Sequence, residues 1–278
     1  MKLLRVGKRG HEIVAALDKN NKIRNLSSHI EDLNPDTINS KLISELKKIN
    51  LDTLPVIQST ERIGSCISRP GDFLAIGLNY KAHAEATKSK LPDEPILFNK
   101  STGCILGPND PIIKPRESLK LDYEAEVGIV IGKKAKYVKK ENTQDYVFGY
   151  CIVNDISERS WQKDRGGQWI KGKSVAGNCG PLLVTKDEIE DINNMNITLD
   201  VNGKRRQTGN TSRMIFNFDF LVSHISQFMT LFPGTIITTG TPSGTAMEME
   251  NPKFLEKGDK INIKIDYLGS QEQVVIIE

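Results

Sequence analysis

The 278-residue sequence lacks the features that mark membrane, secreted and nucleic-acid-binding proteins. Its apolar runs all fall well short of the roughly 20 residues that a membrane-spanning helix needs. Residues 1–9 carry charges throughout and no apolar core, so we expect no signal peptide. The 38 basic and 35 acidic residues leave a net charge of only +3, which gives no electrostatic argument for a nucleic-acid partner. We therefore expect a cytoplasmic protein.

Cysteine is also scarce, with four residues at positions 66, 104, 151 and 179. No two of them form a CxxC motif, which disfavours a zinc site and agrees with a reducing compartment. Cys151 lies within an apolar segment and is expected to be a small core residue.

Turn signals and hydrophobic periodicity divide the chain into two predicted domains, residues 1–69 and residues 70–278. In the first, a turn at 18–21 separates two predicted strands, 12–17 and 22–26. Asn34 and Pro35 then predict the start of a helix that continues to Ile49. The segment Arg69-Pro70-Gly71-Asp72 marks the predicted boundary.

The second predicted domain is rich in strands. These strands are expected at residues 73–78, 121–132, 148–155, 197–201, 235–239 and 261–265. Asn202-Gly203 predicts a hairpin turn after the fourth of them, and an apolar face over residues 218–229 predicts one helix. The strands do not alternate regularly with helices, so the fold class is α+β and predominantly β, rather than a Rossmann or TIM topology.

Three acidic residues form the main candidate site. Glu124 and Glu126 are two apart on a predicted strand, so they share one face with backbones about 7 Å apart. Asp155 ends a second, apolar strand, where a lone carboxylate would be costly. The alternative is a solvated acidic face. Three oxygen ligands with open positions would suit Mg²⁺ or Mn²⁺ better than zinc, with Ca²⁺ as a further alternative.

Several short motifs occur in a defined order along the chain. They are residues 75–80 (AIGLNY), His83, 92–98 (PDEPILF), 122–126 (DYEAE), 154–159 (NDISER), 172–174 (GKS) and 239–244 (TGTPSG). This series resembles the fumarylacetoacetate hydrolase family over residues 70–278. The leader, residues 1–5, resembles members often labelled ureidoglycolate lyase. The resemblance implies a mixed β-roll catalytic domain with a small N-terminal α/β cap domain, a homodimer, and a Mg²⁺ or Mn²⁺ centre.

The resemblance also implies roles for individual residues. Glu124, Glu126 and Asp155 would be the metal ligands, and Thr241 would lie in a substrate-binding turn. Arg159, Gln162 and Lys173 would contact substrate on a mobile lid, and the glycines of residues 164–174 around Lys173 would permit its motion. A surface ion pair of Arg159 with Glu158 or Asp164 is the alternative for that residue. If residues 155–159 were helical, Arg159 would share one side with Asp155.

Residues 167–174 also match the GxxxxGK[ST] phosphate-loop pattern. A phosphate loop follows a buried strand and opens a helix. Here charged residues precede the match, and glycines and a proline follow it. We therefore interpret Lys173 as a cation that neutralises substrate charge.

His83 is the predicted general base or water-positioning residue, with a turn-capping structural histidine as the alternative. The family places a Glu three residues after it, but this sequence has Ala86 there. Glu85 is the nearby acid and the remaining catalytic candidate. On a helix, however, residues two apart point to different sides, so Glu85 is not expected to pair with His83.

The predicted reaction is metal-dependent hydrolysis of a C–C bond in a small 2,4-dioxo acid, through an enolate that the metal stabilises. A lyase, decarboxylase or isomerase of a 2-oxo acid would use the same centre, and the altered His–Glu spacing gives decarboxylation some weight. A non-catalytic metabolite-binding protein is the third alternative.

Overall fold

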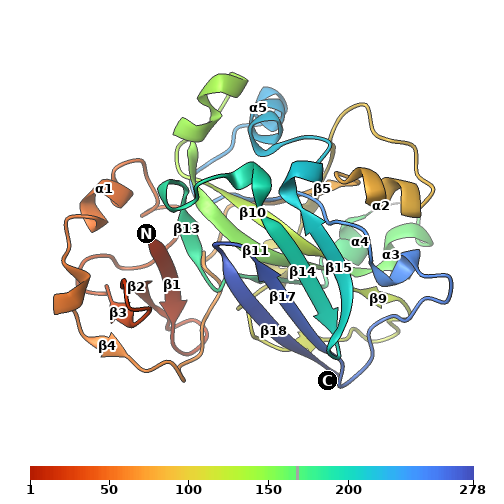
Figure 1. Ribbon diagram of the computed structural model, residues 1–278, viewed down its shortest axis with the longest axis horizontal. Helices are drawn as coiled ribbons and strands as arrows, with labels where there is room; N and C mark the ends of the chain where they lie inside the picture. Colours follow the sequence, from red (N-terminus) through yellow and green to blue (C-terminus); the bar gives the residue numbers. More distant parts are fainter. Residues whose placement is uncertain (167–168) are drawn as a thin grey trace.

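Two β-sheets carry most of the regular structure in residues 1–166 and 169–278, the part of the chain that the computed structural model describes (Figure 1). The larger sheet contains thirteen strands. Ten of them follow the order β4-β3-β2-β1-β13-β11-β10-β16-β5-β6, β9 and β12 pair with β11 outside this order, and β7 pairs with β12. Its strands are β1 (Lys2–Val6), β2 (Ile13–Leu17), β3 (Ile23–Asn25), β4 (Val56–Ile57), β5 (Phe73–Gly77), β6 (Ile96–Lys100), β7 (Ile105–Leu106), β9 (Leu121–Asp122), β10 (Ala125–Ile131), β11 (Val147–Glu158), β12 (Ala176–Cys179), β13 (Leu183–Thr185) and β16 (Ile236–Thr238).

The smaller sheet has the order β15-β14-β17-β18-β8. Its strands are β8 (Ile112–Ile113), β14 (Asn196–Val201), β15 (Lys204–Asn210), β17 (Lys260–Ile265) and β18 (Gly269–Ile276). The predicted hairpin turn is confirmed, since Asn202 and Gly203 both adopt positive φ between β14 and β15.

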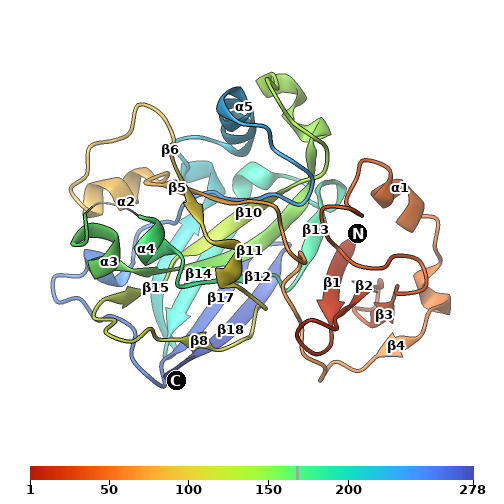
Figure 2. The same ribbon diagram turned by 180° about the vertical axis from the view of Figure 1, so that it is seen from behind.

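The helices are short. The α-helices are α1 (Leu42–Leu46), α2 (Lys81–Ala86), α3 (Arg159–Lys163), α4 (Ile170–Lys173) and α5 (Phe218–Phe228). The 3-10 helices are η1 (Leu51–Thr53), η2 (Thr102–Cys104), η3 (Lys140–Asp145), η4 (Lys186–Glu188), η5 (Ile192–Asn194), η6 (Thr211–Arg213) and η7 (Ala246–Glu248). In both views, α2, α3 and α4 gather at the end of the molecule opposite β1–β4 (Figures 1 and 2).

The predicted α+β, predominantly β class is confirmed, and two element boundaries differ from prediction. The predicted helix from Asn34 to Ile49 is wrong, because α1 covers only Leu42–Leu46. The Asn34 side chain does accept hydrogen bonds from the backbone of Asp36 and Thr37, as an N-cap does, but only a single turn follows it before α1. The predicted strand 121–132 is interrupted between β9 and β10, at the position of Glu124.

The N-terminal strands extend the larger sheet, since β1 pairs with β13. The N-terminal cap and the boundary between residues 69 and 70 stay predictions. In residues 1–166 and 169–278, no helix has both the length and the apolar character to cross a membrane.

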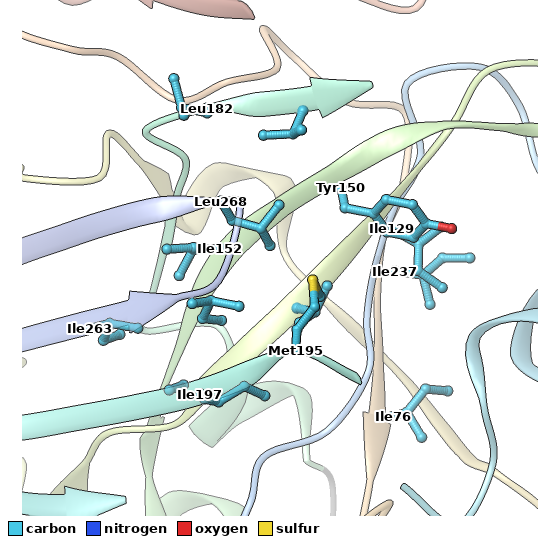
Figure 3. Packing of buried hydrophobic residues seen from close by; sticks show 14 of the residues in the cluster. Ile76, Ile129, Tyr150, Ile152, Leu182, Met195, Ile197, Ile237, Ile263 and Leu268 are labelled. Carbon is cyan, nitrogen blue, oxygen red and sulfur yellow. The ribbon is translucent and has the colours of Figure 1, made fainter. Parts of the chain in front are cut away.

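The central strands β10 and β11 are buried on both faces. On one face Ile129 and Ile152 pack with Ile197 and Ile263 of the smaller sheet (Figure 3). On the other, Val130 and its neighbours belong to a second apolar cluster that includes residues of β1, β2 and α1. Water is thus excluded from both sides of these strands, so a carboxylate on them needs a partner.

Candidate metal centre and active-site pocket

Strands β10 and β11 bring three carboxylates together. The strands are antiparallel, and the Asp155 N–H donates to the Glu124 carbonyl oxygen at 2.9 Å, which sets the two residues side by side. Glu126 lies two residues beyond Glu124, on the same face. One carboxylate oxygen of each residue lies within 4.8 Å of the others, and all three residues are buried. The three acids predicted from sequence therefore form a single cluster.

Glu126 is the member of this cluster that lacks a cationic partner among the described residues. Burial and the neighbouring charges of Asp155 and Glu124 raise its pKa well above the usual range. The Gly240 N–H donates to its Oε2 at 2.8 Å, from a residue whose φ of +88° favours glycine. A divalent cation would offset the repulsion between the three acids, so this donor set fits Mg²⁺ or Mn²⁺.

Glu124 is held by two buried cations. Arg159 Nη2 donates to Oε1 at 2.7 Å, and Lys173 Nζ donates to Oε2 at 2.5 Å. Burial alone would raise the pKa of Glu124, but Arg159 and Lys173 outweigh burial and hold it below the usual range. Lys173 Nζ also lies 3.2 Å from Asp155 Oδ2. Arg159 and Lys173, two of the residues predicted as substrate contacts, therefore lie at the carboxylate cluster.

The second anchor of Arg159 is Asp122, whose Oδ2 accepts from Nε at 2.9 Å. The alternative of a surface ion pair with Glu158 or Asp164 is wrong, because Arg159 is buried and bonded to Asp122 and Glu124. Residues 155–159 do not form a helix, so the condition under which Arg159 would share one side with Asp155 is not met. Strand β11 continues to Glu158, and α3 begins only at Arg159.

Sequence reasoning missed Lys100, the last residue of β6. Its fully buried Nζ donates to Asp155 Oδ1 at 2.5 Å and to the Ala176 carbonyl at 3.2 Å, and it also bonds the Lys173 carbonyl. Burial would lower the pKa of Lys100, but the Asp155 charge outweighs burial and raises it. A lysine that ends an apolar strand directly after the 92–98 motif was the available signal.

Sequence reasoning also missed Glu248, the acid partner of His83. His83 Nδ1 and Glu248 Oε1 are 2.5 Å apart, and both side chains are buried. Glu248 ends η7, where its side chain also accepts from the Gly244 N–H at 2.7 Å. A glutamate seven residues after Thr241 gave no local signal of this pairing. Glu85, in contrast, is exposed and lies 3.7 Å from Lys81, so its predicted catalytic role has no support in the structure.

Glu124 and Glu126 of this cluster form the floor of a pocket between β5, α2 and α3. Its lining includes the predicted residues His83, Glu124, Glu126, Arg159, Gln162, Lys173 and Thr241, and also Ile76, Leu78, Lys163, Trp169 and Met247. Gln162 Oε1 accepts from Arg159 Nη1 at 3.2 Å. Thr241 Oγ1 donates to the Ala125 carbonyl at 3.0 Å, which ties the 239–244 turn to β10.

Part of the predicted lid closes one wall of this pocket. Trp169 packs edge-on against Phe98, with ring centroids 5.1 Å apart. Gly167 and Gln168, which belong to the predicted lid and begin the phosphate-loop match, lie outside the described residues. The segment differs from a phosphate loop in two ways. Its Lys173 is hydrogen-bonded to carboxylates, and helix α3 precedes it, where a phosphate loop follows a strand.

The comparisons with known proteins agree with this geometry. The family model described as fumarylacetoacetate hydrolase, C-terminal, matches residues 72–276. A protein of Burkholderia ambifaria that carries the provisional name hydrolase is 47% identical over 276 residues, which is 98% of each chain.

Two solved structures cover 100% of this chain and 99% of their own. Maleylpyruvate hydrolase from Sphingobium sp. SYK-6, in complex with manganese (II) and pyruvate, has a TM-score of 0.83 and 25% identity. The 2-hydroxyhepta-2,4-diene-1,7-dioate isomerase from Mycobacterium marinum has a TM-score of 0.79 and 28% identity. The protein is an enzyme with a site for a divalent metal, and the chain belongs to the fumarylacetoacetate hydrolase family.

Proposed function

We propose that the enzyme hydrolyses the bond between C3 and C4 of a small 2,4-dioxo acid. The observation that carries this proposal is the His83–Glu248 pair, because His83 lines the same pocket as Glu124 and Glu126. A histidine whose one ring nitrogen is held by a carboxylate is suited to activating water. The similarity to a maleylpyruvate hydrolase is in line with this reaction.

Glu124, Glu126 and Asp155 would hold the metal, proposed to be Mg²⁺ or Mn²⁺. When bound, the ion supplies Lewis-acid polarisation of the substrate's 2-oxo group. Arg159 keeps Glu124 in place and ionised. The side-chain carbonyl oxygen of Gln162 accepts a hydrogen bond from Arg159. The amide nitrogen of Gln162 is therefore the group that can donate to substrate. Lys173 adds positive charge where the substrate carboxylate would lie.

The hydrolytic step needs one base. Because Nδ1 is bonded to Glu248, Nε2 is the nitrogen of His83 that is available to the pocket. It accepts a proton from water as the hydroxyl adds to the C4 carbonyl. The C3–C4 bond then breaks, C4 leaves as a carboxylic acid, and C3 receives a proton to give the 2-oxo acid.

Replacing Glu248 by Gln should lower kcat for hydrolysis by about a hundredfold, because the charge that holds and polarises His83 is lost. KM should change little, since Glu248 does not line the pocket. The matched control is Glu85→Gln, an exposed glutamate two residues from His83, which should leave kcat unchanged. Equal losses in the two variants, measured by steady-state kinetics, would remove the basis for a His83–Glu248 pair in catalysis.

A substrate panel tests the proposed reaction. Acylpyruvates and oxaloacetate are assayed with Mg²⁺, with Mn²⁺ and with EDTA. We expect acylpyruvates to be converted to a carboxylic acid and pyruvate, with turnover lost in EDTA and restored by metal. Turnover of oxaloacetate alone would favour the decarboxylase alternative. Similarity to a 2-hydroxyhepta-2,4-diene-1,7-dioate isomerase also makes isomerisation a second candidate, which product analysis by NMR distinguishes.

We also propose a homodimer, and an exposed aromatic row on α5 supports it. Phe216 precedes α5, and Phe220, His224 and Phe228 lie on it. Successive ring centroids are 5.0–5.6 Å apart, with the first two pairs stacked and the last pair edge-on. Phe228 is 65% exposed, and nearby Phe232 is 50% exposed. Exposed aromatic surface of this kind is typical of subunit interfaces. Light scattering of the purified protein would test the proposal, because a monomer mass contradicts it.

A further inference from the structure

One cation in the pocket has no role in the chemistry described above. Lys163 is the last residue of α3 and lines the same pocket as the carboxylate cluster. Arg159, which bonds Glu124 on the floor, lies four residues earlier in the same helix. Residues four apart share one side of a helix, with about 6 Å between them along its axis. Lys163 thus lies one turn along the pocket wall from the residue that reaches the floor.

Lys163 forms no ion pair with any described residue. The neighbouring acid, Asp164, lies 3.4 Å from Lys120, and the nearest acid of the floor, Glu124, already has Arg159 and Lys173. Partial burial and the charge of Arg159 lower the pKa of Lys163. The pKa of Lys163 thus responds to charges at the floor, such as that of Arg159. No carboxylate of the described residues forms an ion pair with the Lys163 ammonium.

Apolar side chains line part of the pocket. They belong to Ile76 of β5, Leu78, Trp169 and Met247, and the polar residues Thr87 and Ser89 lie beside them in the lining. Such surfaces favour contact with a short carbon chain. The pocket therefore offers a site for a 2-oxo acid at the floor, apolar lining for a short carbon chain, and a positive charge one helical turn from Arg159.

We propose that Lys163 binds a second carboxylate at the far end of the substrate, so that the preferred substrates are 2,4-dioxo acids with an acidic tail. The inference rests on the proposed function of the pocket and adds the charge of the substrate tail. Lys163 would act as a specificity-determining residue and take no part in bond cleavage.

Kinetics with matched substrates test this inference. Succinylpyruvate carries the acidic tail, and butyrylpyruvate has a methyl group in its place. We expect the wild-type enzyme to prefer succinylpyruvate about tenfold in kcat/KM, mainly through KM. Lys163→Met should remove this preference and leave kcat/KM for butyrylpyruvate within about twofold. Lys163→Glu should reverse the preference, because two negative charges would then meet.

Lys171→Met is the matched control. Lys171 carries the same charge in the same part of the chain and is exposed, as Lys163 is, but it bonds the Arg165 carbonyl and does not line the pocket. The preference for the acidic tail should survive in this variant. Equal effects of the two Met substitutions, or no preference in the wild type, would overturn the inference.

A binding measurement separates this inference from the proposed reaction. 2-Oxoadipate and 2-oxohexanoate differ in the same way at the tail, and neither contains the 2,4-dioxo group that is cleaved. Isothermal titration with Mn²⁺-loaded protein should show tighter binding of 2-oxoadipate to wild type and to Lys171→Met, but not to Lys163→Met. If this binding pattern is observed but neither acylpyruvate is turned over, the carboxylate site at Lys163 is supported and the proposed hydrolysis is contradicted. Equal affinities in the wild type would overturn the tail site even if butyrylpyruvate is cleaved.

Discussion

Replacing Glu126 by Gln should abolish metal-dependent turnover and at the same time make the metal-free protein more stable. The substitution removes one of three metal ligands, so metal affinity should fall by more than the ten- to hundredfold typical of an outer-shell change. Loss of the Lewis acid removes several kcal/mol of catalysis, which corresponds to a fall in kcat/KM of about a thousandfold or more.

The gain in stability has a separate cause. Burial and the charges of Asp155 and Glu124 disfavour ionised Glu126 in the metal-free protein, as its raised pKa shows. A neutral Gln of the same shape removes this repulsion and can still accept from the Gly240 N–H. We expect the free energy of unfolding in EDTA to rise by roughly 1–3 kcal/mol, since replacing buried charges is often stabilising to this extent.

Urea denaturation with EDTA or with Mn²⁺ measures both effects. Wild type should gain stability from Mn²⁺, and Glu126→Gln should gain little, because linkage requires binding. The control is Glu158→Gln, another buried glutamate of the same sheet. Hydrogen bonds from Ser118 and Ser160 outweigh its burial and lower its pKa, so this variant should lose stability in either condition. A loss of stability in Glu126→Gln in EDTA would contradict our view of the cluster.

The second large effect is expected for Lys100→Met. This substitution leaves Asp155, which is fully buried, with only the more distant contact to Lys173 at 3.2 Å. It also leaves the Ala176 and Lys173 carbonyls without their donor. Removing one partner of a buried ion pair typically costs about 3–5 kcal/mol, and we expect a loss in this range in EDTA. Mn²⁺ should recover part of it, because the metal would neutralise Asp155.

Lys90→Met is the matched control for Lys100→Met. Lys90 also pairs with an aspartate, Asp93, at 3.1 Å, but both side chains are almost fully exposed. Such pairs contribute about 0–1 kcal/mol, so this variant should unfold at nearly the same urea concentration as wild type. Similar losses in the two variants would show that Lys100 does not compensate a buried charge.

The cluster of three acids could be predicted from sequence because its signals are local. Two glutamates at alternate positions of a strand share a face whatever the rest of the fold does, and an aspartate within an apolar strand needs a partner. The Asn-Gly hairpin and helix α5 were predictable for the same reason, since a turn type and a helical face depend on neighbouring residues. Helix α1 was overestimated, because an apolar periodicity does not show where the turn capped by Asn34 ends.

The sequence by itself therefore determined the strand-rich class, the three acids and the neighbourhood of Arg159 and Lys173. Only the tertiary structure decided which side chain pairs with each buried charged or titratable group. Glu248 lies 165 residues from His83, and Lys100 lies 55 residues from Asp155. Helical and strand periods describe which side chains share a face over a few residues, whereas these pairs form because distant strands and turns pack at one end of the sheet. Burial then makes each pairing necessary, since water cannot solvate the charges there.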